Sequence, residues 1–341
     1  MADLGLAGLR CSEKYGGIGE STITHSIVIE EISKVAPGAA IFLSVHNMVS
    51  KLIETFGTED LKSTHIPNLT SGKHLAAFAL TEPNAGSDAS SLKTKAELKE
   101  ENYILNGEKC YITSAGFADI YLIFAKTSEK EISAFITPAN SEGLSISPAE
   151  KKMGAELSPI ASLNLNNVKV PKENLLGQIG DGYKIALSAL AGGRVSIASC
   201  ALGISEACLA HSVNFLNERS QFKQKLINFQ ALQFTLADIK IMIEASRLLA
   251  WKAGKLIDEN ASVKEINMAA SIAKCYSTDS AMKISTDAVQ MHGGAGYIAE
   301  YKVEGLMRAA KMLQIVEGTN QIQRVVISKS CLLYTSDAAD E

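Results

Sequence analysis

Aromatic residues, paired cysteines and an excess of either charge are all scarce in this chain of 341 residues. Aromatic residues make up 6%, with a single Trp, and the six cysteines form no C-x-x-C pair. The histidines are scattered without the spacing of metal ligands, so we expect no metal site. A net charge of −4 gives no basic face for nucleic acid. No apolar stretch reaches the roughly 18–20 residues of a membrane span, so we expect none.

The composition is instead that of a large globular protein. Hydrophobic residues make up 46% and charged residues 21%, and a chain of this length buries a core that needs no disulfides. Unpaired cysteines indicate reduced thiols, as in a cytosol or a mitochondrial matrix, and we favour the cytoplasm. The start, MADLGLAGLR, lacks the basic and apolar regions of a secretory signal.

Hydrophobic periodicity changes twice along the chain. Helical spacing over residues 20–70 gives way near 75 to short apolar runs separated by Gly, Pro, Asn and Asp, and returns near 181. The pattern predicts an α+β multidomain protein with an N-terminal α-helical domain, a middle β-barrel-like domain and a C-terminal four-helix bundle. The expected boundaries are 1–74, 75–175 and 176–330.

Within the helical regions, breaks and caps fix the expected ends. Pro37-Gly38 separates two helices, Thr58 can cap a third, and Ser262 with Glu265 predicts a capping box. The expected helices include 39–56, 181–217, 226–258, 262–290 and a broken stretch at 299–330.

The middle region predicts strands at its apolar runs, and Asn106-Gly107 between two runs predicts a tight turn. The runs are Leu75–Leu80, Tyr103–Leu105, Tyr111–Thr113, Ile120–Ala125, Ala134–Thr137 and Leu163–Leu165.

Three segments carry residue types suited to chemistry, although the chain has no G-x-G-x-x-G motif, P-loop or G-x-S-x-G elbow. Residues 81–88 (TEPNAGSD) follow an apolar run and offer hydroxyls and bare amides to a polar ligand. Tyr111-Ile112-Thr113 places an aromatic ring beside a hydroxyl. Glu317 lies between apolar residues and a glycine, where a raised pKa suits a general base. The alternative for Glu317 is an acid that stabilises the start of the next helix.

Five segments in order make the chain similar to the acyl-CoA dehydrogenase family of flavoenzymes, from about residue 4 to 330. They are TEPNAGSD, NGEKCYIT, RSQFKQKLINFQ, QMHGGAGY and IVEGTNQIQR. The resemblance implies FAD-dependent α,β-dehydrogenation of a short-chain acyl-CoA thioester, with electrons passed to electron-transferring flavoprotein. It implies that Glu317 takes the Cα proton while a hydride leaves Cβ for the flavin. Some members carry the base before the bundle arginine, where this chain has Gly193.

The resemblance also assigns binding residues and places FAD between the β domain and the bundle. Relatives bind coenzyme A or the thioester near Ser87, Arg194 and Gly318. Ser44, His46 and Asn47 lie where relatives wall the acyl pocket, or are ordinary helix-face residues. Arg219 either binds a phosphate of FAD or pairs with Glu218. The FAD contacts implied for one subunit are Phe78, Leu80, Thr81, Ser87, Tyr111, Ile112, Thr113, Thr319 and Gln321; those implied from a neighbouring subunit are Arg219, Gln230, Gln290, Gly293 and Gly294.

The chain departs from the family pattern at several places. Relatives begin with more helical sequence, so we expect an N-terminal truncation, and residues 331–341 (CLLYTSDAADE) are expected to be a non-family tail. Val316 stands where many relatives have Tyr, Ala191 where they have Asp, and Glu156 where they often have a basic residue.

Alternative functions remain open at this point. An enoyl-CoA reductase would run the same chemistry in reverse, and an acyl-CoA oxidase fits less well because that branch has longer chains. A non-catalytic flavoprotein scaffold and an inactive fragment are further alternatives. The resemblance implies a homotetramer or a homodimer.

Overall fold

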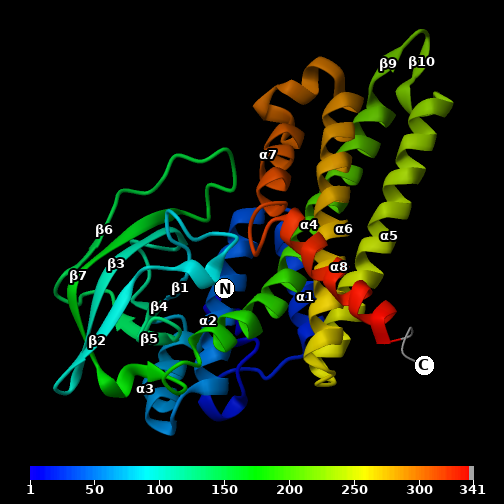
Figure 1. Ribbon diagram of the computed structural model, residues 1–341. Coiled ribbons are helices and arrows are strands. Elements are labelled where there is room, and N and C mark those ends of the chain that lie inside the picture. Colours follow the sequence, from blue (N-terminus) through cyan, green and yellow to red (C-terminus); the bar gives the residue numbers. More distant parts are fainter. Residues whose placement is uncertain (338–341) are drawn as a thin grey trace. The chain divides into compact units, whose positions relative to one another are not determined.

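The structure is a computed structural model that describes residues 1–337 (Figure 1). Its contacts divide the chain into two units. The first unit contains residues 1–21, 42–151 and 158–193, and the second contains residues 22–41, 152–157 and the chain from 194 onward. N-terminal helices, a middle β-sheet region and C-terminal helices follow one another along the sequence, as predicted.

An eight-stranded mixed sheet forms most of the first unit, in the order β6-β7-β3-β2-β4-β5-β8 with β1 paired to β4. Most neighbours are antiparallel, whereas β1 and β2 run parallel to β4. The strands are β1 (Ala76–Ala79), β2 (Lys95–Lys99), β3 (Asn102–Thr113), β4 (Ile120–Lys126), β5 (Ile132–Pro138), β6 (Leu144–Ile146), β7 (Ile160–Pro171) and β8 (Leu175–Leu176). The helices α2 (Pro37–Phe56) and α3 (Glu59–Thr70) accompany the sheet, and Thr58 caps α3 by accepting from the Leu61 amide.

Strand β4 shows how the core of this unit is divided. Its side chains alternate between two apolar clusters, because successive side chains of a strand point to opposite faces. Leu122 and Phe124 pack with residues of α2 and α3, whereas Tyr121 and Ile123 pack with residues of β3 and β7. A strand buried on both faces reads as a continuous apolar run, which is why the sequence revealed it.

The predicted turn at Asn106-Gly107 is wrong, because both residues lie inside the continuous strand β3. The register between β3 and β7 shifts between Leu105 and Gly107, so the extra residue is absorbed by a bulge. Gly107 has a φ of 152°, and a Cβ there would lie 2.7 Å from the Thr94 Cα. The glycine therefore permits the close approach of Thr94, just before β2. The same Asn-Gly sequence is also common in hairpin turns, which is why the sequence predicted a turn here.

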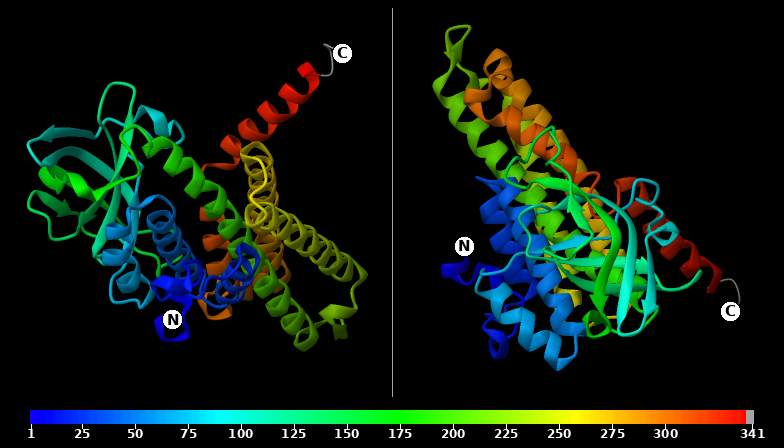
Figure 2. Two further views of the ribbon diagram at one scale, coloured as in Figure 1. Left: turned by 90° about the horizontal axis from the view of Figure 1, so that it is seen from below. Right: turned by 90° about the vertical axis from the view of Figure 1, so that its left-hand side faces the viewer.

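Helices form the second unit, with the long helices side by side and α5 antiparallel to α6 (Figures 1 and 2). The capping box at the start of α6 is present, with the Ser262 hydroxyl and the Glu265 carboxylate each accepting from the other's backbone. The helices are α1 (Thr22–Ser33), α4 (Gly182–Glu218), α5 (Gln230–Asp258), α6 (Val263–His292), α7 (Val303–Leu313) and α8 (Asn320–Asp337), and a short hairpin joins β9 (Ser220–Gln221) to β10 (Gln224–Lys225).

Helix α1 packs with the C-terminal helices, although the sequence groups it with α2 and α3. Asp258 of α5 accepts from the Thr22 amide at 2.8 Å, and Ser33 donates to the Cys200 carbonyl of α4. Apolar spacing predicted the helix but not which apolar residues it buries. Ile29 is fully buried, whereas Val35 just beyond the helix end is 87% exposed. The family-level boundaries at 74 and 175 stay predictions.

Helix α4 is long and apolar enough to cross a membrane by length and composition, alone among the described helices. This corrects the expectation that no stretch reaches that length, which overlooked a run rich in small Ala, Gly and Ser residues. However, 78% of its most apolar window is buried within the protein, as in a core helix.

Helix α8 continues through Asp337. Residues 331–337 of the expected non-family tail therefore extend a helix, and residues 338–341 lie outside the described part. The six cysteines carry no disulfide: five are buried, and Cys331 is exposed.

Candidate active site

Glu317 lies in the turn between α7 and α8. The turn is tight because two consecutive residues have left-handed backbone, with φ of 55° at Glu317 and 84° at Gly318. A non-glycine residue in this region costs roughly 1–2 kcal/mol, so the surroundings must hold it. A side chain at position 318 would start 2.8 Å from the Gln323 amide nitrogen, which explains the glycine.

The Glu317 carboxylate is poorly solvated. Its Oε2 atom is buried and accepts no hydrogen bond from any residue between 1 and 337. Burial raises the pKa of Glu317 to about 7, while the positive charges of Arg194 and Lys274 act in the opposite direction. An acid that capped α8 would accept a bond from an amide of the first turn. The carboxylate lacks that bond, so its setting fits a proton acceptor better than a helix cap.

Arg194 of α4 supplies one of the two cations near Glu317. Its side chain is 5% exposed, and its Nη1 lies 3.5 Å from Asn267 Oδ1 and 3.4 Å from Ser271 Oγ of α6. Its Nε is buried and finds no acceptor in the described part of the chain. Burial lowers the pKa of Arg194, and Glu317 acts in the opposite direction. Arg194 therefore acts as a partner charge for Glu317, and the coenzyme A contact that the resemblance implies for it stays a prediction.

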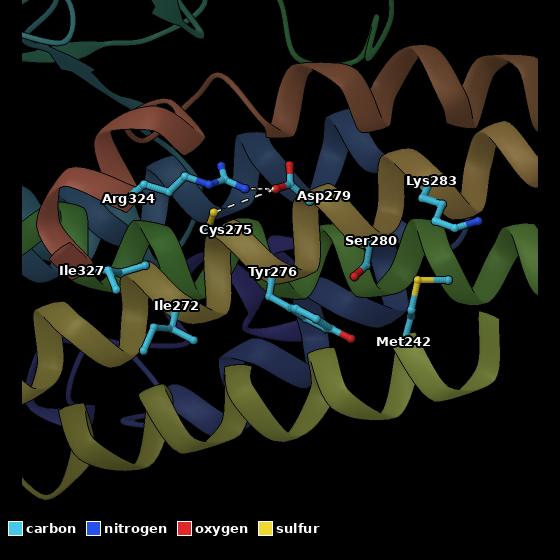
Figure 3. A pocket seen from close by; sticks show the side chains of 9 residues that line it. All are labelled: Met242, Ile272, Cys275, Tyr276, Asp279, Ser280, Lys283, Arg324 and Ile327. Atoms are coloured by element: carbon cyan, nitrogen blue, oxygen red, sulfur yellow. Dashed lines mark hydrogen bonds and ion pairs between the residues drawn. The ribbon is translucent and has the colours of Figure 1, made fainter. Parts of the chain in front are cut away.

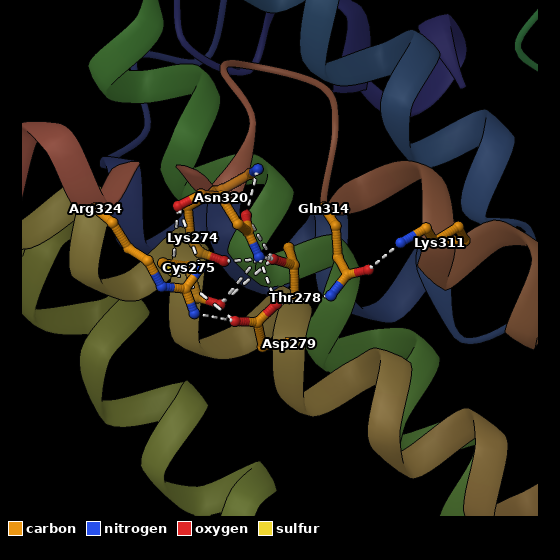
Figure 4. A network of polar contacts seen from close by, with 8 residues as sticks. All are labelled: Lys274, Cys275, Thr278, Asp279, Lys311, Gln314, Asn320 and Arg324. Atoms are coloured by element: carbon orange, nitrogen blue, oxygen red, sulfur yellow. Dashed lines mark hydrogen bonds and ion pairs between the residues drawn. The ribbon is translucent and has the colours of Figure 1, made fainter. Parts of the chain in front are cut away.

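A network of polar side chains lies beneath the turn (Figure 4). Lys274 of α6 donates to the Gly318 carbonyl at 2.9 Å and to Asn320 Oδ1 at 2.7 Å. Gln323 of α8 donates to the carbonyls of Glu317 and Gly318 at 3.1 and 2.8 Å. Sequence reasoning missed these residues. A lysine on a face of small buried residues, between Ala270 and Thr278, was the available signal.

In the first unit, the segment 81–88 is held from below by a buried ion pair. Glu82 accepts from Lys109 Nζ at 2.7 Å and from the amides of Lys93 and Thr94 at 2.5 and 3.0 Å. Although burial favours the neutral acid, Lys109 and these amides hold the pKa of Glu82 below its usual range. Ser87, predicted to bind ligand, is exposed at the tip. The segment is therefore held in place at Glu82, while Ser87 at its tip is open to solvent.

The residues predicted to face the flavin, in or just after β1 and in β3, differ in how far their side chains are exposed. Tyr111 is 66% exposed, with a left-handed φ of 58°, whereas the side chain of Ile112 is buried in the core. Ile112 can therefore meet a surface ligand only through its backbone. Phe78 is half-buried against Phe124, with ring centroids 4.9 Å apart. Leu80 is buried, while Thr81 and Thr113 are partly exposed.

The cofactor residues implied for the second unit fall into two groups. Arg219, Gln230, Gln290, Gly293 and Gly294 are exposed, and they lie at the end of the bundle where α4 and α6 finish and α5 begins (Figure 1). The other group, Thr319 and Gln321, begins α8 beside the middle of α6.

At 1.5 Å per residue, the twelve residues from Thr278 to Gln290 place the two groups about 18 Å apart. The two groups therefore lie at different levels of α6, and their assignment to two subunits stays a prediction.

Arg219 forms no ion pair with Glu218 or with any other acid in the described part of the chain. The alternative that Arg219 pairs with Glu218 therefore lacks support. His46 and Asn47, in contrast, have structural partners: His46 Nε2 lies 3.0 Å from the Leu69 carbonyl, and Asn47 donates to the Leu6 carbonyl at 2.9 Å. These contacts favour the helix-face reading of the two residues.

A cavity of about 460 Å³ lies apart from Glu317, between α5, α6 and α8 (Figure 3). Met242, Ile272 and Ile327 form its apolar wall, and the Arg324–Asp279 ion pair of 2.7 Å closes one side. Glu317 does not line it, so this cavity is not the candidate active site. No group of three potential metal ligands occurs among residues 1–337.

Family profiles match three consecutive segments of the chain. "Acyl-CoA dehydrogenase, N-terminal domain" matches residues 1–73, the middle domain 77–168 and the C-terminal domain 180–332. An acyl-CoA dehydrogenase of Bacillus subtilis is 45% identical over 338 residues, which cover 97% of this chain and 88% of the relative. The chain belongs to the acyl-CoA dehydrogenase family. It is thus a flavin-dependent oxidoreductase, as the sequence predicted.

Solved structures of the family agree with this assignment. Butyryl-CoA dehydrogenase from Megasphaera elsdenii has a TM-score of 0.94 at 42% identity, covering 97% of this chain and 88% of its own. A structure described as the electron transferring flavoprotein of Acidaminococcus fermentans has a TM-score of 0.95 at 43% identity, with the same coverage. Acyl-CoA dehydrogenase complexed with FAD from Bacillus anthracis has a TM-score of 0.93 at 35% identity, covering 98% of this chain and 61% of its own.

Proposed function

We propose that this acyl-CoA dehydrogenase oxidises a short-chain acyl-CoA thioester to its trans-2-enoyl-CoA, with Glu317 as the base that removes the Cα proton. The observation that carries the proposal is the Glu317 carboxylate, which has a buried oxygen without a hydrogen-bond donor and a pKa raised to about 7 by burial. A group with its pKa near neutral pH can both accept and release a proton there, as a general base requires. The similarity to butyryl-CoA dehydrogenase supports a short acyl chain.

FAD is the cofactor of this enzyme, and residues of each unit suit it. An exposed aromatic ring at Tyr111 can cover a flavin face. The Arg219 guanidinium, which pairs with no acid among residues 1–337, suits a diphosphate. A Cβ added at Gly293 or Gly294 would meet no atom within 4 Å, so their backbone is open to approach. When bound, FAD supplies the acceptor for the hydride that leaves Cβ. The proposed cofactor contacts are Phe78, Leu80, Thr81, Ser87, Tyr111, Ile112, Thr113, Arg219, Gln230, Gln290, Gly293, Gly294, Thr319 and Gln321.

The residues around Glu317 serve the proton transfer. The Cα proton passes to the carboxylate, which becomes a neutral acid, so a poorly solvated site favours the product of this step. Negative charge then develops on the thioester oxygen, which needs a donor. The Glu317 amide makes no hydrogen bond within residues 1–337 and is free to supply one. Ser87, Arg194 and Gly318 are the proposed substrate contacts.

We further propose that electrons pass to an electron-transferring flavoprotein and that the enzyme works in the cytoplasm as a homotetramer. The likeness to the Acidaminococcus fermentans structure supports the electron acceptor. The homotetramer, in which a second copy completes the FAD site, rests on the family resemblance.

Glu317→Gln tests the base directly. The amide keeps the size of the side chain but cannot accept the proton, so kcat with butyryl-CoA should fall at least about a thousandfold while flavin content stays unchanged. Glu304→Gln on α7 is the matched control, because Glu304 pairs with Arg308 away from Glu317, and it should keep most activity. Retention of more than a tenth of the activity in Glu317→Gln would remove Glu317 as the base.

A further inference from the structure

Lys274 is fully buried, yet no carboxylate lies within ion-pair distance of its ammonium group in the described part of the chain. A buried charge without a counter-ion is costly, so a lysine in such a place is typically tied to a specific task. Its two acceptors are neutral: the Gly318 carbonyl at 2.9 Å and Asn320 Oδ1 at 2.7 Å. Both belong to the segment that begins with Glu317.

The acceptor Asn320 is itself fixed in orientation. Its Nδ2 donates to Asp279 Oδ1 at 2.7 Å and to Thr278 Oγ1 at 2.9 Å, so its Oδ1 must face Lys274 (Figure 4). Gln314, after α7, donates to the same Asp279 oxygen at 2.7 Å. The end of α7 is thus anchored to α6 through Asp279, and the start of α8 through both Asp279 and Lys274.

The strained turn depends on few bonds. The Gly318 carbonyl accepts from Lys274 and Gln323, and within residues 1–337 the Glu317 carbonyl accepts only from Gln323. Because a left-handed backbone is unfavourable in itself for a non-glycine residue such as Glu317, loss of one donor should let the turn relax. The Glu317 side chain would then lose its fixed direction.

The charged and titratable groups around Lys274 come from three elements. Asp279 and Cys275 lie on its own helix, Glu317 lies in the turn, and Arg194 belongs to α4. Burial lowers the pKa of Lys274 to about 8, while Cys275, Glu317 and Asp279 act to raise it. Lys274 and Arg194 are therefore the two cations that act on Glu317.

We propose that Lys274 is a positioning residue, whose ammonium group fixes the Glu317–Gly318 turn and supplies a nearby positive charge that favours the ionised base. The inference rests on the proposed function of Glu317. It assigns to Lys274 no contact with substrate or cofactor. Its role is to hold the backbone that carries the base and to keep the carboxylate ready to accept a proton.

The test uses flavin-loaded enzyme carrying Lys274→Met, Lys274→Gln or Lys274→Arg. Infrared titration of the carboxyl band, assigned by its loss in Glu317→Gln, reports the midpoint of Glu317 without turnover. In Lys274→Met this midpoint should rise by about one pH unit, because a favourable charge is lost. At pH 7, kcat with butyryl-CoA should fall at least roughly tenfold, while KM changes less than about threefold.

The other variants separate charge from hydrogen bonding. Lys274→Gln keeps a donor without the charge, so its midpoint should rise as in Lys274→Met while kcat falls less. Lys274→Arg keeps the charge, so its midpoint should stay near that of the wild type. Lys283→Gln is the control, since Lys283 is an exposed lysine of the same helix that pairs with Asp287 and not with the turn, and it should change neither quantity.

Each outcome decides between separate claims. An unchanged midpoint and kcat in Lys274→Met, with Glu317→Gln inactive, would overturn the role of Lys274 and leave the proposed function intact. An active Glu317→Gln would overturn the proposed function instead, whatever the infrared midpoint shows. If Lys274→Met does not bind flavin, Lys274→Gln replaces it. Failure of both to fold would show a purely structural lysine and overturn the inference.

Discussion

At the scale of single residues, Glu317 combines features that a stable fold avoids. It has a left-handed backbone, a buried carboxylate oxygen to which no described residue donates, and a pKa raised to about 7 by burial. Each of these is unfavourable for folding, and functional sites are where such features gather. The sequence revealed the glutamate and its apolar neighbours. It did not reveal Lys274, because the two residues lie 43 positions apart and only the packing of α6 against the turn joins them.

The raised pKa of Glu317 makes a prediction about stability. The carboxyl binds its proton more tightly in the folded state than in the unfolded chain, where its pKa is near 4.5. Its contribution is therefore complete below pH 4.5 and is lost as the pH rises through about 7. Glu317→Gln mimics the neutral acid and should be more stable than the wild type at pH 8.5, by roughly 3 kcal/mol.

Urea unfolding of both proteins at pH 5 and pH 8.5 measures this difference. Glu304→Gln serves as a control with the opposite sign, because the Arg308 partner lowers the pKa of Glu304. An equal stability difference between Glu317→Gln and the wild type at both pH values would contradict the raised pKa.

At the scale of elements, sequence patterns predicted correctly those features that depend on a single helix or strand. Thr58 and Ser262 cap the helices that they were expected to cap. The pattern misled where a neighbouring strand decides, as at Asn106-Gly107, whose bulge depends on the approach of β2. Strand β2 was also missed, because its exposed lysines and glutamate conceal the alternation.

The segment 81–88 depends on the buried pair of Glu82 and Lys109. Lys109→Met should destabilise the protein by about 3 kcal/mol, because it leaves the Glu82 carboxylate buried with amide donors alone. Lys95→Met, which alters an exposed lysine of β2, should leave the urea midpoint nearly unchanged. Similar midpoints for the two variants would show that the pair does not support the segment.

At the scale of the whole molecule, hydrophobic periodicity alone predicted the order of helices, sheet and helices. Five motifs in sequence order predicted the family. Periodicity could not predict which distant segments pack together. Helix α1 joins the C-terminal helices through contacts such as Thr22 with Asp258, which are 236 positions apart. The small-residue run of α4 likewise conceals the length of the most apolar helix.

The most direct test of the account is an anaerobic titration of the flavin-loaded enzyme with butyryl-CoA, followed by flavin absorbance. The wild type should lose its oxidised flavin band within one equivalent per active site, whereas Glu317→Gln should bind the same ligand and keep its band. Bleaching of Glu317→Gln at the wild-type rate, or no bleaching of the wild type by any acyl-CoA, would contradict Glu317 as the base of an acyl-CoA dehydrogenation.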